Sequence, residues 1–209
     1  MRRPCVAISH FPSSGGHAVG RRVADLLGYG FFDREIIDQI VRDEGVQQRL
    51  VRELDEHVRS AIDRYLLDAF RGGNFTESDY LKSVIRVLQA LGHEGAAVVL
   101  GRGAPFVLSG RQALRVLVVA PTPQRIDRLA QKLSLDLVPA AKRLEQDESN
   151  RREFLRHHFG IDRQDDPMLY DLVVNTGGLS VDVAADLVAD AVRRRFPQER
   201  SAEAFATHP

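Results

Sequence analysis

The chain has 209 residues, 44% of them hydrophobic and 28% charged, which is the composition of a globular protein rather than a disordered one. Lys and Arg together number 29, as do Asp and Glu, so no net charge would attract a nucleic acid polymer or an acidic membrane. The single cysteine, Cys5, excludes an internal disulfide, and no apolar segment has the length of a membrane span or the form of a signal peptide. We therefore expect a cytoplasmic protein.

The first element in the chain is an apolar run that leads through a Ser- and Gly-rich turn into an amphipathic helix, VAISHFPSSGGHAVG at 6–20. The usual phosphate loop, G-x-x-x-x-G-K-[ST], would need Gly at 10, Lys at 16 and a hydroxyl at 17. Those positions carry His10, Gly16 and His17. We predict a cradle of backbone N–H groups at a helix N-terminus, without the lysine; the alternative is an ordinary strand-to-helix turn. The residues expected to bind phosphate are Ser13, Ser14, Gly15, Gly16 and His17.

Apolar, β-branched runs predict buried parallel strands, and helical patterns lie between them. Helices are expected at His17–Leu27, after Thr122 as an N-cap, and after Ser180 as an N-cap. Strands alternating with helices predict an α/β fold of three layers, a doubly wound sheet with helices on both faces. The expected strands are Cys5–Ser9, Tyr29–Phe32, Ala96–Leu100, Leu114–Ala120 and Leu172–Asn175.

One stretch, about 34–93, shows helical periodicity and no strand pattern. Val46–Phe70 predicts one long helix, and a capping box at Thr76–Asp79 predicts the start of the next. The apolar stripe of the long helix could pack on the domain or line a homodimer interface. We expect a single domain at 1–196 with this helical insertion after the second strand, followed by a flexible polar tail at 197–209.

Ligands of open α/β sheets bind beyond the carboxyl ends of the strands, and polar residues follow each predicted strand. Arg102 lies between two glycines, Gly101 being the first, which lets a ligand approach the backbone while Arg offers a forked donor to phosphate. Its alternative is a surface arginine at a strand end. Asp33 and Arg34 follow the second strand and could contact an acceptor nucleotide, while Asp33 could also cap the next helix.

Between the fourth and fifth strands, DESNRREFLRHHFG places several arginines within about three helical turns. Arg152 and Arg156 are four residues apart and share a face, with Arg151 beside them. Such a cluster suits a mobile lid, at about 136–162, that clamps polyphosphate. The alternative is a solvated helix whose acidic neighbours neutralise the arginines. The adjacent histidines at 157 and 158 have no third ligand, so no metal-binding residue is assigned.

With these residues laid out, the chain resembles the cytidylate kinase-like family, a branch of the P-loop nucleoside monophosphate kinases. The resemblance implies a five-stranded parallel sheet, a nucleotide-binding insertion and an arginine-bearing lid. It also implies Mg²⁺-assisted transfer of a phosphoryl group from ATP to CMP or a similar nucleotide. The segments that carry it are SSGGHAVGRRVADLLGYGFFDREII, VVLGRGAPFVL, LRVLVVAPTPQRIDRL, DESNRREFLRHHFGID and YDLVVNTGGLSVDVA.

In this resemblance Arg102 maps onto the arginine that faces the acceptor phosphate, and Arg151 onto the last residue of the lid motif. The lysine at 16 and the nearby hydroxyl that holds Mg²⁺ are absent. The role of the lysine needs cation density rather than one residue type. Three functions stay open: a kinase-like phosphotransferase, a non-catalytic nucleotide-binding regulator with a degenerate loop, and a structural or interaction protein in which the long helix at Val46–Phe70 mediates association. The arginines expected to compensate in catalysis are Arg102, Arg128, Arg151 and Arg156.

Overall fold

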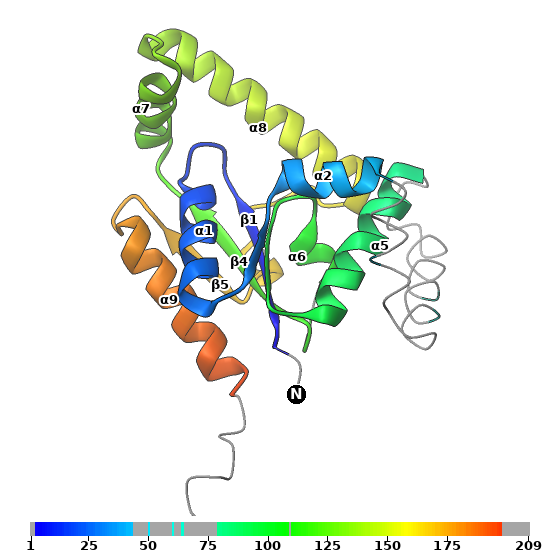
Figure 1. The fold of residues 1–209 in the computed structure, drawn as a ribbon. Coiled ribbons are helices and arrows are strands. Elements are labelled where there is room, and N and C mark those ends of the chain that lie inside the picture. The colour runs from blue at the N-terminus through cyan, green and yellow to red at the C-terminus, as the bar shows by residue number, and fades with distance from the viewer. Residues whose placement is uncertain are drawn as a thin grey trace, which may run out of the picture.

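The computed structural model contains a five-stranded, all-parallel sheet in the order β2-β3-β1-β4-β5 (Figure 1). The sheet confirms the predicted α/β class and each of the five predicted strands to within one residue or so at the ends. The strands are β1 (Cys5–His10), β2 (Gly30–Phe32), β3 (Ala97–Leu100), β4 (Ala113–Val119) and β5 (Leu172–Asn175). The structure describes residues 3–43, 50, 60, 64, 79–108 and 110–197.

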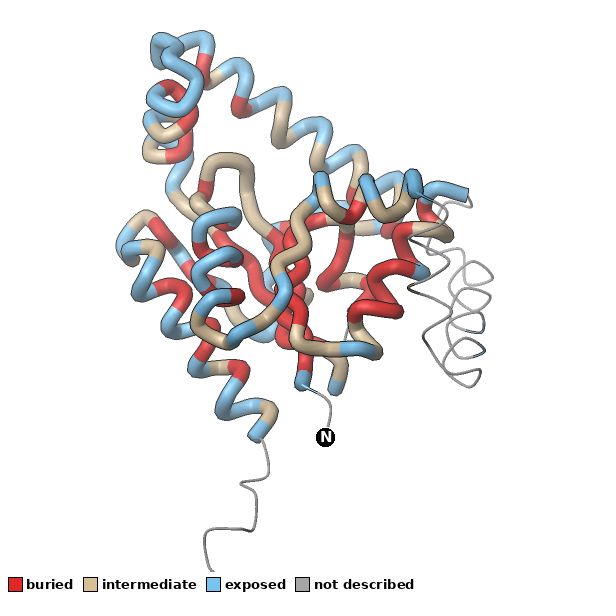
Figure 2. Tube along the Cα trace, in the orientation of Figure 1, coloured by how far each residue is buried: buried red, intermediate tan, exposed pale blue. Residues whose placement is uncertain are grey.

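Helices cover both faces of the sheet, because the side chains of β1 alternate between two hydrophobic clusters. Val6 and Ile8 pack in the cluster that includes α1 and α9, while Cys5 and Ala7 pack in the cluster that includes α5 and α6. Burial is concentrated on these two faces (Figure 2). The described helices are α1 (Gly16–Leu27), α2 (Arg34–Arg42), α5 (Asp79–Glu94), α6 (Ala104–Val107), α7 (Thr122–Leu133), α8 (Leu137–Phe159) and α9 (Val181–Arg195), with a 3₁₀ turn at Pro167–Leu169.

Two predicted helix caps are confirmed and a third is wrong. The side chain of Asp33 accepts hydrogen bonds from the amides that open α2, and Ser180 accepts one from Val183 N–H in α9. Thr122 is the first residue of α7 rather than its cap, because Pro121 already has extended backbone angles and takes the N-cap position. The Thr122 hydroxyl instead accepts a hydrogen bond from Arg125.

Three predictions fall largely outside the described residues: most of the helix at 46–70, residues 76–78 of the capping box at 76–79, and nearly all of the tail at 197–209. Of the insertion, α2 and α5 are described, and they pack against each other. None of the helices in the described ranges combines the length and apolar character that crossing a bilayer requires.

The long helix α8 passes above the carboxyl ends of the strands (Figure 1). It follows α7 after a short turn, and its far end reaches the core through Leu155 and Phe159. A Cβ on Gly103 would lie 2.2 Å from the Phe159 ring, so only glycine allows this end of α8 to settle on the turn after β3. The helix therefore crosses the edge of the sheet at which α/β folds of this kind bind their ligands.

Candidate functional site

The loop between β1 and α1 has the backbone form of an anion site. Ser13 and Gly15 both have positive φ, +59° and +81°, which turns successive peptide groups toward one side. Gly15 is the N-cap of α1 and makes no side-chain cap, and the first helical bond runs from Val19 N–H to Gly15 O. The amide groups of the first turn thus have no partner further back in the helix, which favours a negatively charged ligand.

Ser14 anchors this loop, and its hydroxyl group is already used within the protein. It is fully buried, and its hydroxyl donates a hydrogen bond to Val118 O in β4 over 3.0 Å. Its own carbonyl accepts a hydrogen bond of 2.6 Å from the Thr176 hydroxyl at the end of β5. The serine therefore ties the loop to two neighbouring strands, a role that its sequence position alone did not indicate.

Gly16 stands where an ordinary phosphate loop has lysine, and the side chain of His10 leaves no room for one. A Cβ at Gly16 would lie 2.4 Å from His10 Cβ and 2.6 Å from His10 Cγ. The His10 ring is half-buried, and its Nδ1 lies 3.0 Å from Phe11 O. Burial, aided by the charges of Arg151 and His17, lowers the pKa of His10 to about 3. The two departures from the motif, at 10 and at 16, are thus one structural feature.

Arg128 of α7 lies on the Gly15 side of the loop. Its Nη1 donates to the Thr176 hydroxyl over 3.0 Å and its Nη2 to the Thr176 carbonyl over 2.8 Å. A Cβ on Gly15 would lie 3.8 Å from Arg128 Nη1. The sequence prediction placed Arg128 near phosphate, and the structure brings it to the loop.

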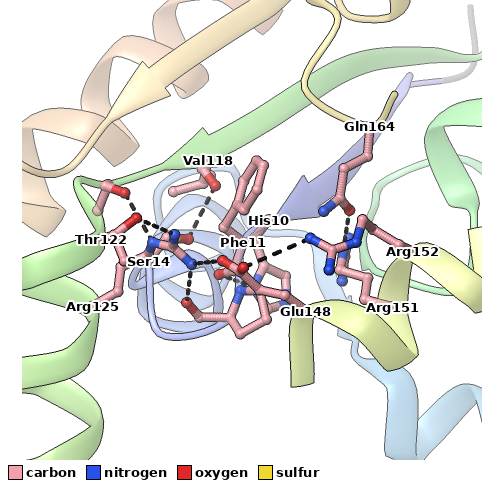
Figure 3. Close-up of polar contacts among 12 residues, drawn as sticks. His10, Phe11, Ser14, Val118, Thr122, Arg125, Glu148, Arg151, Arg152 and Gln164 are labelled. Carbon is pink, nitrogen blue, oxygen red and sulfur yellow. Dashed lines mark hydrogen bonds and ion pairs between the residues drawn. The ribbon is translucent and has the colours of Figure 1, made fainter. Parts of the chain in front are cut away.

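Arg151 of α8 lies on the other side, at the end of β1 (Figure 3). Its Nη2 donates to Ser9 Oγ and its Nε to Gln164 Oε1, each over 2.8 Å. Burial lowers the pKa of Arg151 to about 10, so the group remains a cation at neutral pH. Sequence reasoning selected Arg151 but not Ser9 or Gln164, because neither belongs to a recognisable motif.

Arg125 is the most buried of the arginines at this edge, with 5% of its surface exposed. Its guanidinium donates to Ala120 O over 3.0 Å and to the carboxylate of Glu148 in α8, and it stacks over the Phe11 ring at 5.2 Å (Figure 3). Arg152 approaches the same carboxylate at 3.9 Å. Arg125 thus fastens α8 to the loop, and its charge is already neutralised.

Arg102 is likewise paired with a carboxylate. Its Nε donates to Asp38 Oδ1 over 2.7 Å, its Nη2 donates to Asp38 Oδ2, and Tyr80 O–H donates to Asp38 Oδ1 over 3.0 Å. The guanidinium also lies 5.3 Å from the centre of the Phe154 ring. Burial acts to raise the pKa of Asp38, but the hydrogen bonds and charge of Arg102, with Tyr80, outweigh it, and the pKa lies below its ordinary value.

The backbone around Arg102 is unusual, since the residue has φ +50° and its glycine neighbours have +83° and +72°. A non-glycine residue in this region carries strain, of order 1 kcal/mol. The turn directs Arg102 toward α2 and α5 rather than toward the phosphate loop. Sequence reasoning found Arg102 but missed Asp38, which is 64 positions away and belongs to no motif.

Other predicted residues lie at the rim. His17 is exposed, with Nε2 3.4 Å from Asp33 Oδ2, and Arg34 is exposed and lies 3.8 Å from Asp38. Arg156 is exposed on α8, and within the described part of the chain no hydrogen bond or ion pair joins its guanidinium to the loop. The predicted residues therefore form two groups, with Arg156 outside both. The loop group is Ser13, Ser14, Gly15, Gly16, His17, Arg128 and Arg151, and the Arg102 group is Gly101, Arg102, Asp33 and Arg34.

The arginines of the site fall into two classes, those with a carboxylate partner and those without one among the described residues. Arg102 and Arg125 each have a carboxylate partner. Within the residues that the structure describes, Arg128 and Arg151 have only neutral hydrogen-bond partners. Among the described residues, the two arginines without a carboxylate partner are thus Arg128, beside Gly15, and Arg151, at the end of β1.

Three contacts of α8 follow one another at intervals of three residues. Glu148 meets the helix that follows β4, Arg151 meets the end of β1, and Phe154 meets the turn that follows β3. These strands are neighbours in the sheet in the same order. One helix thus connects the loop group to the Arg102 group.

The side chains at the loop do not form a cage for Mg²⁺. In the described ranges no group of three or more His, Cys, Asp and Glu side chains could hold a metal ion. Mg²⁺ prefers oxygen ligands, and position 17, where the motif supplies a hydroxyl, carries an imidazole. The predicted Mg²⁺ stays a prediction.

Residues 5–178 match the cytidylate kinase-like family. The chain belongs to this family. The cytidylate kinase of Aeropyrum pernix is 30% identical over 195 residues, which cover 90% of this chain and 98% of that protein. The cytidylate kinase of Methanopyrus kandleri is 23% identical over 197 residues, covering 90% and 92%.

Among solved structures, an uncharacterized protein from Eubacterium ventriosum has a TM-score of 0.69 and 16% identity to this chain, covering 91% of it and 98% of that protein. A likeness at this identity supports the fold alone. The family match confirms the resemblance inferred from the sequence segments. The solved structure supports the fold of this cytidylate kinase-like chain.

Proposed function

We propose that the protein transfers a phosphoryl group from ATP to a nucleoside monophosphate, with CMP the favoured acceptor. Membership of the cytidylate kinase-like family supports a kinase, and the relatives named cytidylate kinase support the choice of CMP. Phosphoryl transfer depends mainly on positioning and on stabilising the charge of the transferred group. The question for this chain is which groups provide that charge without a loop lysine.

The observation that carries the proposal is the position of the two arginines that have no carboxylate partner in the part of the chain that the structure describes. Arg128 and Arg151 flank a loop whose amides already favour an anion. Unpaired guanidinium groups offer forked donors to phosphate oxygens at little cost, since no existing ion pair has to break. We assign them to the phosphates of ATP, with the amides of Gly15, Gly16 and His17 beneath.

The acceptor is assigned to the neighbouring group around Arg102. This guanidinium follows β3 and is already held by Asp38, so an acceptor phosphate would share it or displace the carboxylate. Asp33 and Arg34 stand at the rim of the same region. Mg²⁺ is expected to arrive with ATP, coordinated mainly by phosphate oxygens and water.

The experiment is a screen of nucleoside monophosphates for ADP formation from ATP in the presence of Mg²⁺. Formation of ADP with CMP, and little with AMP, GMP or UMP, is the expected result. Chromatography should show CDP in equal amount to ADP. ADP formation that does not depend on any monophosphate, or none with any of them, would contradict the proposal.

A second candidate, a regulator that binds nucleotide without turnover, is favoured by the missing lysine at Gly16 and by the carboxylate already bound to Arg102. ATP would then raise the melting temperature, because it binds the folded state, while no ADP is formed. Melting curves and the ADP assay on one preparation separate the two functions.

A further inference from the structure

The lysine of an ordinary phosphate loop is absent at position 16, and the side chain of His10 leaves no space for it there. The His10 side chain and a Cβ at position 16 would overlap, with 2.4 Å to His10 Cβ and 2.6 Å to Cγ of its ring. A change of Gly16 alone would therefore force the histidine or the loop to move. Position 10 is the first position of the usual motif, which is glycine there.

The imidazole that fills this space is neutral. The Phe11 carbonyl can only accept a hydrogen bond, so His10 Nδ1 carries the proton and Nε2 is an unprotonated acceptor. Its pKa of about 3 keeps it in this state at neutral pH. No positive charge therefore sits inside the loop, where an ordinary lysine would place one.

A cation of α8, Arg151, acts on this ring. Arg151 Nη2 donates to Ser9, the residue before His10, and the charge of Arg151 acts on His10. Figure 3 shows the two side chains at the same end of β1. Arg151 has no carboxylate partner among the described residues, so its charge is available to a ligand.

We propose that His10 is a positioning residue that excludes a cation from the loop and so passes the role of the lysine to Arg151, making ATP binding depend on the seating of α8. This inference rests on the proposed use of ATP and adds to it a required partner for the loop. In an ordinary loop the lysine is carried by the loop itself. Here the equivalent charge would come from a helix, through Arg151, which lies 142 positions after its hydrogen-bond partner Ser9.

The test moves the cation from the helix back to the loop. The double variant His10→Gly with Gly16→Lys restores glycine at 10 and lysine at 16, as in the ordinary motif. Arg151→Gln is then made in the native chain and in this double variant. The affinity for Mg²⁺ with a non-hydrolysable ATP analogue is measured by calorimetry. Arg143→Gln is the matched control, since Arg143 lies on α8 but is exposed and paired with Asp147.

In the native chain Arg151→Gln should weaken analogue binding by about 10- to 100-fold, the usual effect of one charge-assisted contact. In the double variant the same change should cost less than about 3-fold, because the lysine supplies the charge. Gly16→Lys alone should bind more weakly than the double variant. An equal loss from Arg151→Gln in both backgrounds overturns the proposal, and so does tight binding by Gly16→Lys alone.

If circular dichroism shows that the double variant does not fold, the proposal is tested by hydrogen exchange on the native chain and on Arg151→Gln. The analogue should slow exchange in both the loop and α8, and Arg151→Gln should abolish the slowing in α8 only. Unchanged protection of α8 in that variant overturns the proposal. Because a non-hydrolysable analogue is used, lack of CMP phosphorylation would contradict the proposed function while leaving these results intact.

Discussion

Asp38 of α2 holds the guanidinium of Arg102 with both carboxylate oxygens, and so joins the helical insertion to the turn that follows β3. Both side chains are largely buried, with 16% and 11% exposed. A pair in such a setting is costly to break on one side only, since the remaining charge loses its partner without regaining water.

Arg102→Ala is therefore expected to affect both activity and stability. Phosphoryl transfer to CMP should fall by about 100-fold, as expected when a donor to a charged group is removed. The free energy of unfolding should fall by about 1–3 kcal/mol, because Asp38 is left unpaired. Adding Asp38→Asn should restore part of the stability but none of the activity. Urea unfolding and the CMP assay measure the two effects, and full activity in Arg102→Ala would remove this residue from the site.

Glu148→Gln should weaken the attachment of α8. Arg125 is buried and loses its only carboxylate partner within the described residues, so the free energy of unfolding should fall by about 1–3 kcal/mol. The control is Asp147→Asn, which breaks the exposed pair with Arg143 and should cost less than about 0.5 kcal/mol. Denaturant unfolding compares the two, and equal losses would show that the Arg125 contact has no special weight.

His10 should make the protein less stable as the pH falls below about 6.5. The unfolded chain takes up a proton on this histidine near its ordinary pKa of about 6.5, whereas the folded state does so only near 3. Between these values the unfolded state binds more protons, so stability falls with falling pH. His10→Asn, whose amide can replace the Nδ1 donor, should flatten this dependence. Melting temperatures from pH 8 to pH 4 test it, and parallel curves for the two proteins would contradict it.

Arg128→Gln should weaken ATP binding without unfolding the protein. Its guanidinium lies beside Gly15 and, among the described residues, has only neutral partners, so its loss removes charge from the loop and breaks no ion pair described there. The rise in melting temperature that ATP produces should shrink to less than about half at the same ATP concentration. Lys132→Gln, an exposed cation one turn further along α7, is the control and should keep the full rise. An identical rise in both variants would exclude Arg128 from the site.

The sheet was predictable from the sequence because each strand is a short apolar run followed by a polar turn. Cys5–His10 and Ala113–Val119 illustrate this: nearly every side chain is buried, so neither needed the context of the other to be found. The caps at Asp33 and Ser180 were predictable for a similar reason, since a cap acts on amides two or three residues away.

The pairings at the site could not be predicted, because they join residues far apart in the chain. Asp38 and Arg102, or Arg125 and Glu148, come together only through the sheet order and the path of α8. The missing lysine was visible in the sequence, but its steric cause was not. His10 and Gly16 were two separate departures from a motif until the fold placed one ring over the other backbone.

The spacing of the contacts along α8 has a mechanical consequence. Three residues of an α-helix rise about 4.5 Å, and neighbouring strands lie about 4.8 Å apart. From Glu148 to Arg151 to Phe154 the helix therefore advances by about one strand at each contact. A shift of α8 along its axis therefore cannot break one of these contacts and keep the others, and all three are lost together. Because one helix makes all three contacts, a displacement of α8 at Glu148 also displaces its contact at Phe154.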